Sequence, residues 1–93
     1  MAPYPLSGDI AAVPNLSKHH HHDPSLIAFG DTVRRIRLAH ELSQEELAFR
    51  TGLDRSYMGG VERGENNVTL LKMRAIAEAL GLSLTELMRK AKL

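Results

Sequence analysis

The 93-residue chain contains no cysteine, so neither a disulfide framework nor a thiolate metal site is available to it. It also lacks any apolar run of about eighteen residues, the length that a membrane span needs. Its N-terminus shows no basic stretch followed by an apolar one. These absences predict a protein that neither crosses a membrane nor carries a secretory signal, and they fit a reducing cytoplasm.

Motifs of catalysis are missing as well. The chain has no HExxH, no glycine-rich phosphate loop and no clustered carboxylates beyond those that cap helices. At 43% hydrophobic residues, a chain of this length builds one modest core without a roomy cleft. We therefore expect no catalytic site, no cofactor and no small-molecule ligand.

Proline is confined to the first 24 residues, at Pro3, Pro5, Pro14 and Pro24. Residues 1–25 show no sustained period and are predicted to be a flexible arm, with Asp23 and Pro24 as the cap and first position of a helix. The arm includes His19 to His22, a run typical of a tag remnant or a polar tract. Consecutive residues on a flexible arm do not form a preorganised tetrahedral site, so we expect no physiological metal there.

Residues 26–93 contain start and stop signals for five short helices. No segment alternates apolar and polar residues with period two, as a strand would. Two capping boxes, Ser43 to Glu46 and Ser83 to Glu86, open helices. Asp54 and Thr69 open two others, and helices end at Gly52, Gly64 and Gly81. In the first helix an apolar stripe predicts core packing for Phe29, Val33, Ile36 and His40. The predicted fold class is all-α.

Two of these helices, about 43–51 and 54–63, are separated only by Gly52 and Leu53. So short a connection makes the helices cross steeply, with Ala48 at the contact, Leu53 in the corner, and Met58 and Val61 beneath. This is the helix-turn-helix arrangement, whose second helix enters the major groove of DNA.

The residues around this corner resemble the phage repressor and Cro (XRE-type) family. The resemblance lies in Ser43-Gln44-Glu45-Glu46-Leu47-Ala48, Gly52, Met58, and Val61-Glu62-Arg63-Gly64, and it continues through Thr69-Leu70, Ile76-Ala77, Ala79-Leu80-Gly81, Ser83-Leu84 and Glu86-Leu87. It covers residues 26 to 88 and implies a compact, lambda-repressor-like domain over 26–93. The segments Leu53-Asp54-Arg55-Ser56-Tyr57 and Gly60-Val61-Glu62-Arg63 are similar to the controller proteins of restriction-modification systems, which are small dimers that time expression of an endonuclease gene.

The family resemblance implies a set of DNA contacts. Gln44, beside the cap Ser43, would clamp a phosphate at a helix N-terminus, or simply lie exposed. Arg55 and Ser56 would read base edges, and Asp54 would either orient Arg55 or serve only as a cap. Tyr57 would reach a phosphate or a thymine methyl, or lie flat against the preceding helix. The residues implied to contact DNA are Ser43, Gln44, Arg55, Ser56, Tyr57, Gly59, Gly60, Arg63 and Asn67.

Two features depart from the family pattern. Gly59 and Gly60, inside the predicted recognition helix, each cost on the order of 1 kcal/mol relative to alanine. They indicate close approach of the backbone to DNA, avoidance of a clash, or neutral drift at an exposed position. The loop Glu65-Asn66-Asn67 replaces basic residues with an acid and two amides, which predicts modest affinity for the DNA backbone.

Arg37 and Glu62 match a family ion pair that fixes the angle of the recognition helix.

The last helix is more apolar than one small domain needs, and its expected role is a homodimer contact through Leu84, Leu87, Met88 and Ala91. The sequence thus predicts a transcriptional regulator, a repressor or restriction-modification controller, that binds double-stranded DNA at a two-fold operator. An antitoxin that represses its own operon, or an interaction module that no longer reads DNA, remain alternatives.

Overall fold

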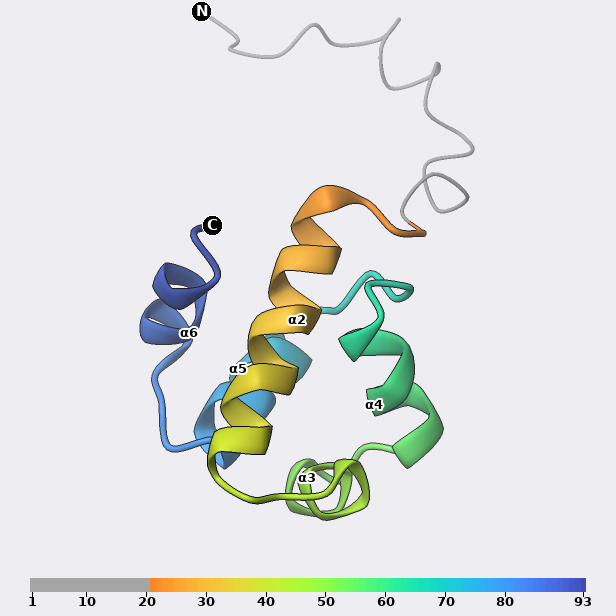
Figure 1. Ribbon diagram of the computed structural model, residues 1–93, viewed down its shortest axis with the longest axis vertical. Coiled ribbons are helices and arrows are strands. Elements are labelled where there is room, and N and C mark those ends of the chain that lie inside the picture. The colour runs from red at the N-terminus through yellow and green to blue at the C-terminus, as the bar shows by residue number, and fades with distance from the viewer. Residues whose placement is uncertain (1–20) are drawn as a thin grey trace, which may run out of the picture.

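The computed structural model describes residues 21–93, which fold into five helices without a strand. The helices are α2 (Pro24–Ala39), α3 (Gln44–Thr51), α4 (Arg55–Glu62), α5 (Leu70–Ala79) and α6 (Leu84–Lys90) (Figure 1). The predicted all-α class with five short helices is confirmed. Residues 1–20, which hold most of the predicted arm together with His19 and His20, lie outside the described range. No helix in residues 21–93 has the length and apolarity of a membrane span.

Helix α2 begins at Pro24, as the sequence predicts, and ends at Ala39, one residue before His40, the last residue of the predicted apolar stripe. The Asp23 carboxylate accepts a hydrogen bond from the Ser25 N–H at 2.8 Å, and Pro24 occupies the first turn, where no N–H is needed. The helix stops at Ala39, and His40 is its exposed C-terminal cap. The prediction that His40 packs in the core is wrong, because α2 ends at Ala39 and does not continue to His40.

Both predicted capping boxes are present. The Ser43 hydroxyl accepts from the Glu46 N–H at 3.0 Å, and the Glu46 carboxylate accepts from the Ser43 N–H at 2.9 Å. Ser83 and Glu86 repeat the pattern at the start of α6, at 3.0 and 2.8 Å. These bonds to the cap backbone and hydroxyl hold the pKa of both glutamates below its usual value.

The core takes buried side chains from all five helices. In Figure 1, α2 runs down the middle of the domain, with α4 and α6 on opposite sides and α3 across its lower end. Helix α2 packs on α4 and α6, and α3 packs on α4 and α5. The large side chains buried most completely come from every helix: Val33, Leu47, Met58, Val61, Ile76, Leu80 and Leu87.

Gly30 sets how closely α2 approaches α4. A Cβ at this position would overlap the backbone carbonyl oxygen of Val61 and approach the Glu62 carbonyl group within 2.9 Å. Backbone atoms cannot rotate away as a side-chain end does, so only glycine allows this contact. Nothing local in the sequence marks Gly30 as different from other helical glycines, so its role is visible only in the structure.

Candidate nucleic-acid interface

The turn between α3 and α4 is as tight as the sequence predicts. Gly52 takes the left-handed conformation (φ 73°), which glycine adopts without strain, and ends α3. The Leu53 N–H then donates to the Ala48 carbonyl at 3.0 Å and lies 3.2 Å from the Thr51 hydroxyl oxygen. Leu53 packs half-buried against the core. The corner therefore turns the chain directly from α3 into α4.

Helix α4 buries one side and presents its first turn to solvent. Met58 and Val61 face the core with 0% and 1% of their surface exposed, whereas Arg55 and Ser56 are both exposed. Asp54 occupies the N-terminal cap but makes no capping hydrogen bond through its side chain. The side chains of Arg55 and Ser56 are thus accessible from solvent.

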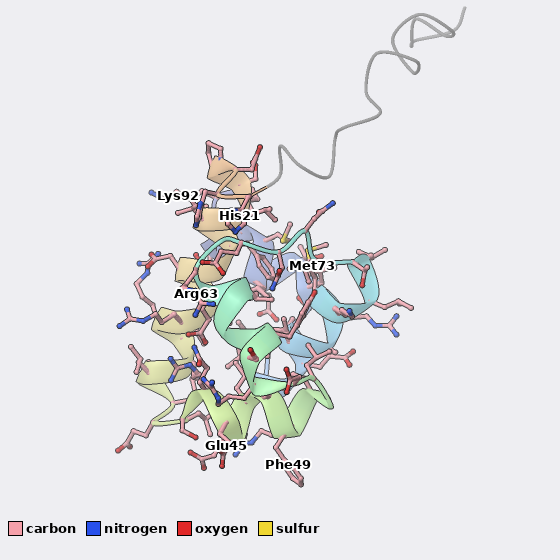
Figure 2. The ribbon with its side chains drawn as sticks, turned by 90° about the vertical axis from the view of Figure 1, so that its right-hand side faces the viewer. His21, Glu45, Phe49, Arg63, Met73 and Lys92 are labelled. Carbon is pink, nitrogen blue, oxygen red and sulfur yellow. The ribbon has the colours of Figure 1, made fainter. Side chains whose placement is uncertain are left out.

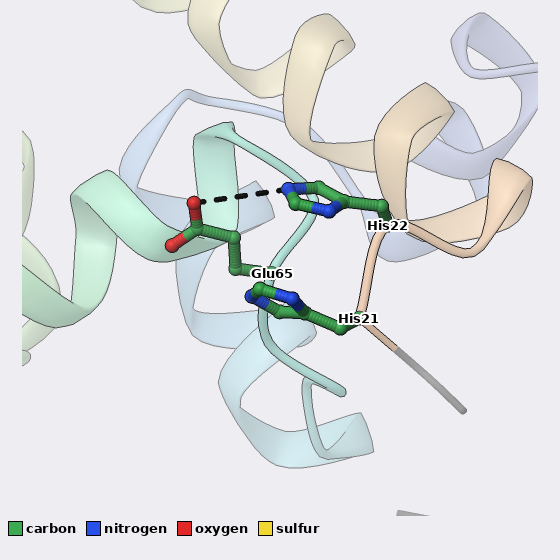
Figure 3. Close-up of side chains that lie close together, drawn as sticks. All are labelled: His21, His22 and Glu65. Atoms are coloured by element: carbon green, nitrogen blue, oxygen red, sulfur yellow. Dashed lines mark ion pairs between the residues drawn. The ribbon is translucent and has the colours of Figure 1, made fainter. Parts of the chain in front are cut away.

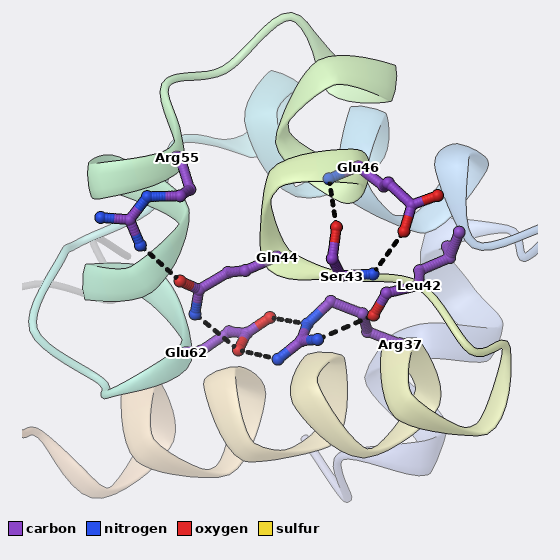
Figure 4. Close-up of polar contacts among 7 residues, drawn as sticks. All are labelled: Arg37, Leu42, Ser43, Gln44, Glu46, Arg55 and Glu62. Atoms are coloured by element: carbon purple, nitrogen blue, oxygen red, sulfur yellow. Dashed lines mark hydrogen bonds and ion pairs between the residues drawn. The ribbon is translucent and has the colours of Figure 1, made fainter.

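The guanidinium of Arg55 is held by Gln44 and not by Asp54. Gln44 accepts from Arg55 NH1 through its Oε1 at 3.0 Å. Its Nε2 donates to the Glu62 Oε1, also at 3.0 Å (Figure 4). One side chain of α3 therefore joins both ends of α4. Neither alternative that the sequence left open for Gln44, a phosphate clamp or a merely exposed residue, included this bridge.

The Arg37–Glu62 pair is present and anchors this network. The Arg37 Nε and NH2 donate to the two Glu62 oxygens at 2.7 and 3.0 Å, and its NH1 donates to the Leu42 carbonyl at 2.8 Å. Only 9% of the Arg37 side chain and 2% of the Glu62 side chain are exposed. The hydrogen bond to Glu62 raises the pKa of Arg37. A continuous chain of polar contacts thus runs from α2 through Glu62 and Gln44 to Arg55.

Gly59 and Gly60 are both buried, so the reading of neutral drift at an exposed position is wrong. A Cβ at Gly60 would overlap the amide nitrogen of Asn66. A Cβ at Gly59 would lie 3.0 Å from Arg63 NH1 and 3.3 Å from the Gln44 Oε1. Of the readings left open, avoidance of a clash has a visible cause at Gly60, where a Cβ would overlap the Asn66 amide. The neighbours of a Cβ at Gly59 are the ends of the Arg63 and Gln44 side chains, which can shift.

The loop after α4 folds back on the helix. The Asn66 amide donates to the Tyr57 carbonyl at 3.3 Å, and the Glu65 N–H donates to the Gly60 carbonyl at 2.9 Å. Arg63 donates to both oxygens of Glu65, at 3.0 and 3.1 Å, although 60% of the Arg63 side chain is exposed. The pair raises the pKa of Arg63 and lowers that of Glu65. The acid in this loop is therefore already paired with a cation.

The remaining predicted DNA contacts differ in how much of their surface is exposed. Ser43 and Asn67 are exposed, and Tyr57 is half-buried against the core. The ammonium of Lys72, on α5, lies 4.5 Å from the centre of the Tyr57 ring, a cation–π contact. Lys72 could not be predicted from the sequence, because no local pattern connects α5 to the first turn of α4.

The predicted dimer residues divide into core and surface. Leu87 and Ala91 are 0% and 7% exposed and belong to the interior of the domain. Their side chains are already covered, so they do not offer a surface for a partner. Leu84 and Met88 are half-buried, and Leu93 keeps half of its surface exposed.

Elsewhere, Phe49 points away from α3 with 87% of its surface exposed (Figure 2).

Comparison with known proteins places this geometry in a family. The family model described as helix-turn-helix matches residues 33–87, more than half of the chain. The chain belongs to the helix-turn-helix family. It is a DNA-binding transcriptional regulator with the lambda-repressor-like arrangement of five helices.

Similar proteins include two named control proteins. Control protein C.BamHI from Bacillus amyloliquefaciens is 43% identical over 63 residues, covering 67% of this chain and 78% of that protein. Control protein C.SmaI from Serratia marcescens is 45% identical over 60 residues, covering 64% and 71%. Among solved structures, the restriction-modification controller protein C.AhdI from Aeromonas hydrophila is 51% identical with a TM-score of 0.68, covering 70% of this chain and 98% of that one.

Proposed function

We propose that this helix-turn-helix protein is a restriction-modification controller that binds a two-fold symmetric operator as a homodimer, with α4 in the major groove. The observation that carries the proposal is the exposed first turn of α4. There the guanidinium of Arg55 is held by a hydrogen bond to Gln44, which is itself bonded to the buried Arg37–Glu62 pair. An arginine so placed suits a bidentate contact with the O6 and N7 of guanine. Similarity to control proteins supports the regulatory role.

The start of α3 suits a DNA phosphate. The capping box occupies the N–H groups of Ser43 and Glu46, which leaves those of Gln44 and Glu45 at the positive end of the helix dipole. The Gln44 amide uses one of its two N–H hydrogens on Glu62. Its second hydrogen is available to a phosphate oxygen without breaking the bridge to α4. Gln44 would then fix both the register on the backbone and the position of Arg55.

A dimer follows from the small reading surface. One α4 presents few side chains to base edges, and the two buried glycines present none, so a specific site needs two copies. We place the contact on α6 at Leu84, Met88 and the nearby Leu93, since these residues keep apolar surface that the protomer does not cover. We propose that the protein binds DNA without catalysing a reaction. We propose the cytoplasm as its location, since its DNA target lies there.

Selection of bound sequences from a random DNA pool tests the function. We expect enrichment of a symmetric motif whose half-sites lie about 10 bp apart, one helical turn, so that two copies of α4 lie on one face of the duplex. Enrichment of a single isolated half-site would contradict the dimer. No enrichment at all would contradict DNA reading and favour an interaction module.

A further inference from the structure

The first described residues of the chain meet the loop that follows α4. The His22 N–H donates to the Gly64 carbonyl at 2.8 Å, which ties this segment to the loop. His22 adopts a left-handed backbone (φ 63°), uncommon for a residue with a side chain. With this turn the rings of His21 and His22 lie on the same side, with centroids 4.3 Å apart. Both rings lie beside the carboxylate of Glu65 (Figure 3).

These three side chains offer the donors of a transition-metal site. One ligand atom from each of His21, His22 and Glu65 lies within 4.8 Å of the others, and the His22 Nε2 is 3.8 Å from a Glu65 oxygen. Imidazole nitrogens and a carboxylate oxygen are a set that Zn²⁺ accepts, at about 2.0–2.2 Å each. Tetrahedral ligands at that distance are about 3.4 Å apart. Both imidazoles are exposed, so we expect their side-chain rotation to close this difference.

We propose that His21, His22 and Glu65 bind a divalent transition-metal ion of the Zn²⁺ class, with water in the open position. The site differs from chelation by a histidine run, because its third ligand is 43 residues away in the loop after α4. The expectation that His19 to His22 binds no metal rested on a flexible arm. The hydrogen bond from His22 to Gly64 and the approach of Glu65 remove that premise for His21 and His22.

A metal at this site competes with Arg63. Both Glu65 oxygens accept hydrogen bonds from the Arg63 guanidinium, and the oxygen nearer to His22 is the one bonded to Arg63 Nε. An ion on that oxygen takes it from Arg63 and places two positive charges side by side. Metal binding thus displaces Arg63, the cation at the end of α4, from its partner. Removal of Arg63 should then strengthen metal binding.

Calorimetric titration of the full chain with Zn²⁺ at neutral pH tests the site independently of DNA. We expect one saturable site, a loss of affinity of at least about tenfold in Glu65→Gln and in His21→Ala/His22→Asn, and a gain of several-fold in Arg63→Ala. Asparagine is chosen at position 22 because it tolerates the left-handed backbone. Glu45→Gln, an exposed charge change on α3, and His19→Ala/His20→Ala are controls that should bind within about twofold of the parent.

The outcomes separate the site from its alternatives. Wild-type affinity in Glu65→Gln together with loss in His19→Ala/His20→Ala would mean that the histidine run alone binds the ion, and would overturn the proposal. The absence of saturable binding would overturn it too. Because no DNA is present, neither result bears on the operator-binding function.

Discussion

At the scale of single residues, Arg55 is the side chain that we propose determines which bases are read. It is exposed at the first turn of α4, and Gln44 limits the directions in which its guanidinium extends. A base contact and a phosphate contact are distinguishable by mutation, because only the first depends on sequence. We propose that Arg55 contacts a base edge and that Gln44 contacts a phosphate.

Replacement of Arg55 by alanine should weaken binding to the selected operator by about 1–3 kcal/mol and relax the preference at one position of each half-site. Fluorescence anisotropy with the operator and with single-base variants measures both effects. Gln44→Ala should instead weaken binding to all these sequences. An equal loss on every sequence for Arg55→Ala would make Arg55 a phosphate contact.

The two glutamates near the end of α4 provide a second comparison. Glu62 is buried with Arg37, whereas Glu65 pairs with the exposed Arg63. Glu62→Ala should cost about 3–5 kcal/mol of unfolding free energy, because it leaves a buried guanidinium without its partner. Glu65→Ala should change the melting temperature little, since solvent screens an exposed pair. Equal changes in thermal denaturation would show that the Arg37–Glu62 pair does not hold α4 in place.

At the scale of elements, the sequence predicts what is encoded locally. Capping boxes at Ser43 and Ser83 and the glycine turn at Gly52 each depend on residues a few positions apart, and each is found. The Gln44 bridge to Glu62 joins residues eighteen positions apart, and no pattern along the chain marks it. His40 shows a different limit of prediction from sequence. The apolar period of α2 continues to His40 in the sequence, although the helix ends at Ala39.

Gly30 is an element-scale feature with a measurable consequence. Gly30→Ala should destabilise the protein by about 1–3 kcal/mol, because the new methyl group pushes α2 away from the backbone at the end of α4. Operator affinity should fall as well, although Gly30 touches no DNA. Gly59→Ala is the control, since its Cβ meets only side-chain ends that can move. A melting temperature for Gly30→Ala no lower than for Gly59→Ala would refute the packing argument.

At the scale of the whole molecule, the protomer's core sets which surface is left for a partner. The sequence assigned Leu84, Leu87, Met88 and Ala91 to the dimer contact as one apolar face. Burial of Leu87 and Ala91 inside the protomer divides that face. Periodicity identifies an apolar helix face, but which part of it the protomer covers depends on how α2 and α5 pack against α6.

Met88→Gln/Leu93→Gln should weaken self-association about tenfold or more while the helical content is retained, because both side chains would be polar at the proposed contact. Sedimentation equilibrium measures the dissociation constant, and circular dichroism checks the fold. Arg89→Gln, on the exposed surface of the same helix, is the matched control. An unchanged dissociation constant in the double variant would move the contact away from α6.

The central claim is that the first turns of α3 and α4 form the surface that contacts DNA. NMR of the ¹⁵N-labelled full chain with the selected operator tests this claim most directly. We expect the largest amide shifts at the start of α3 and α4, in residues 43–45 and 54–57, since these positions would lie against the duplex. Smaller shifts should reach Arg63 and Asn67. Shifts concentrated on α5 and α6, with residues 54–57 unchanged, would contradict the account.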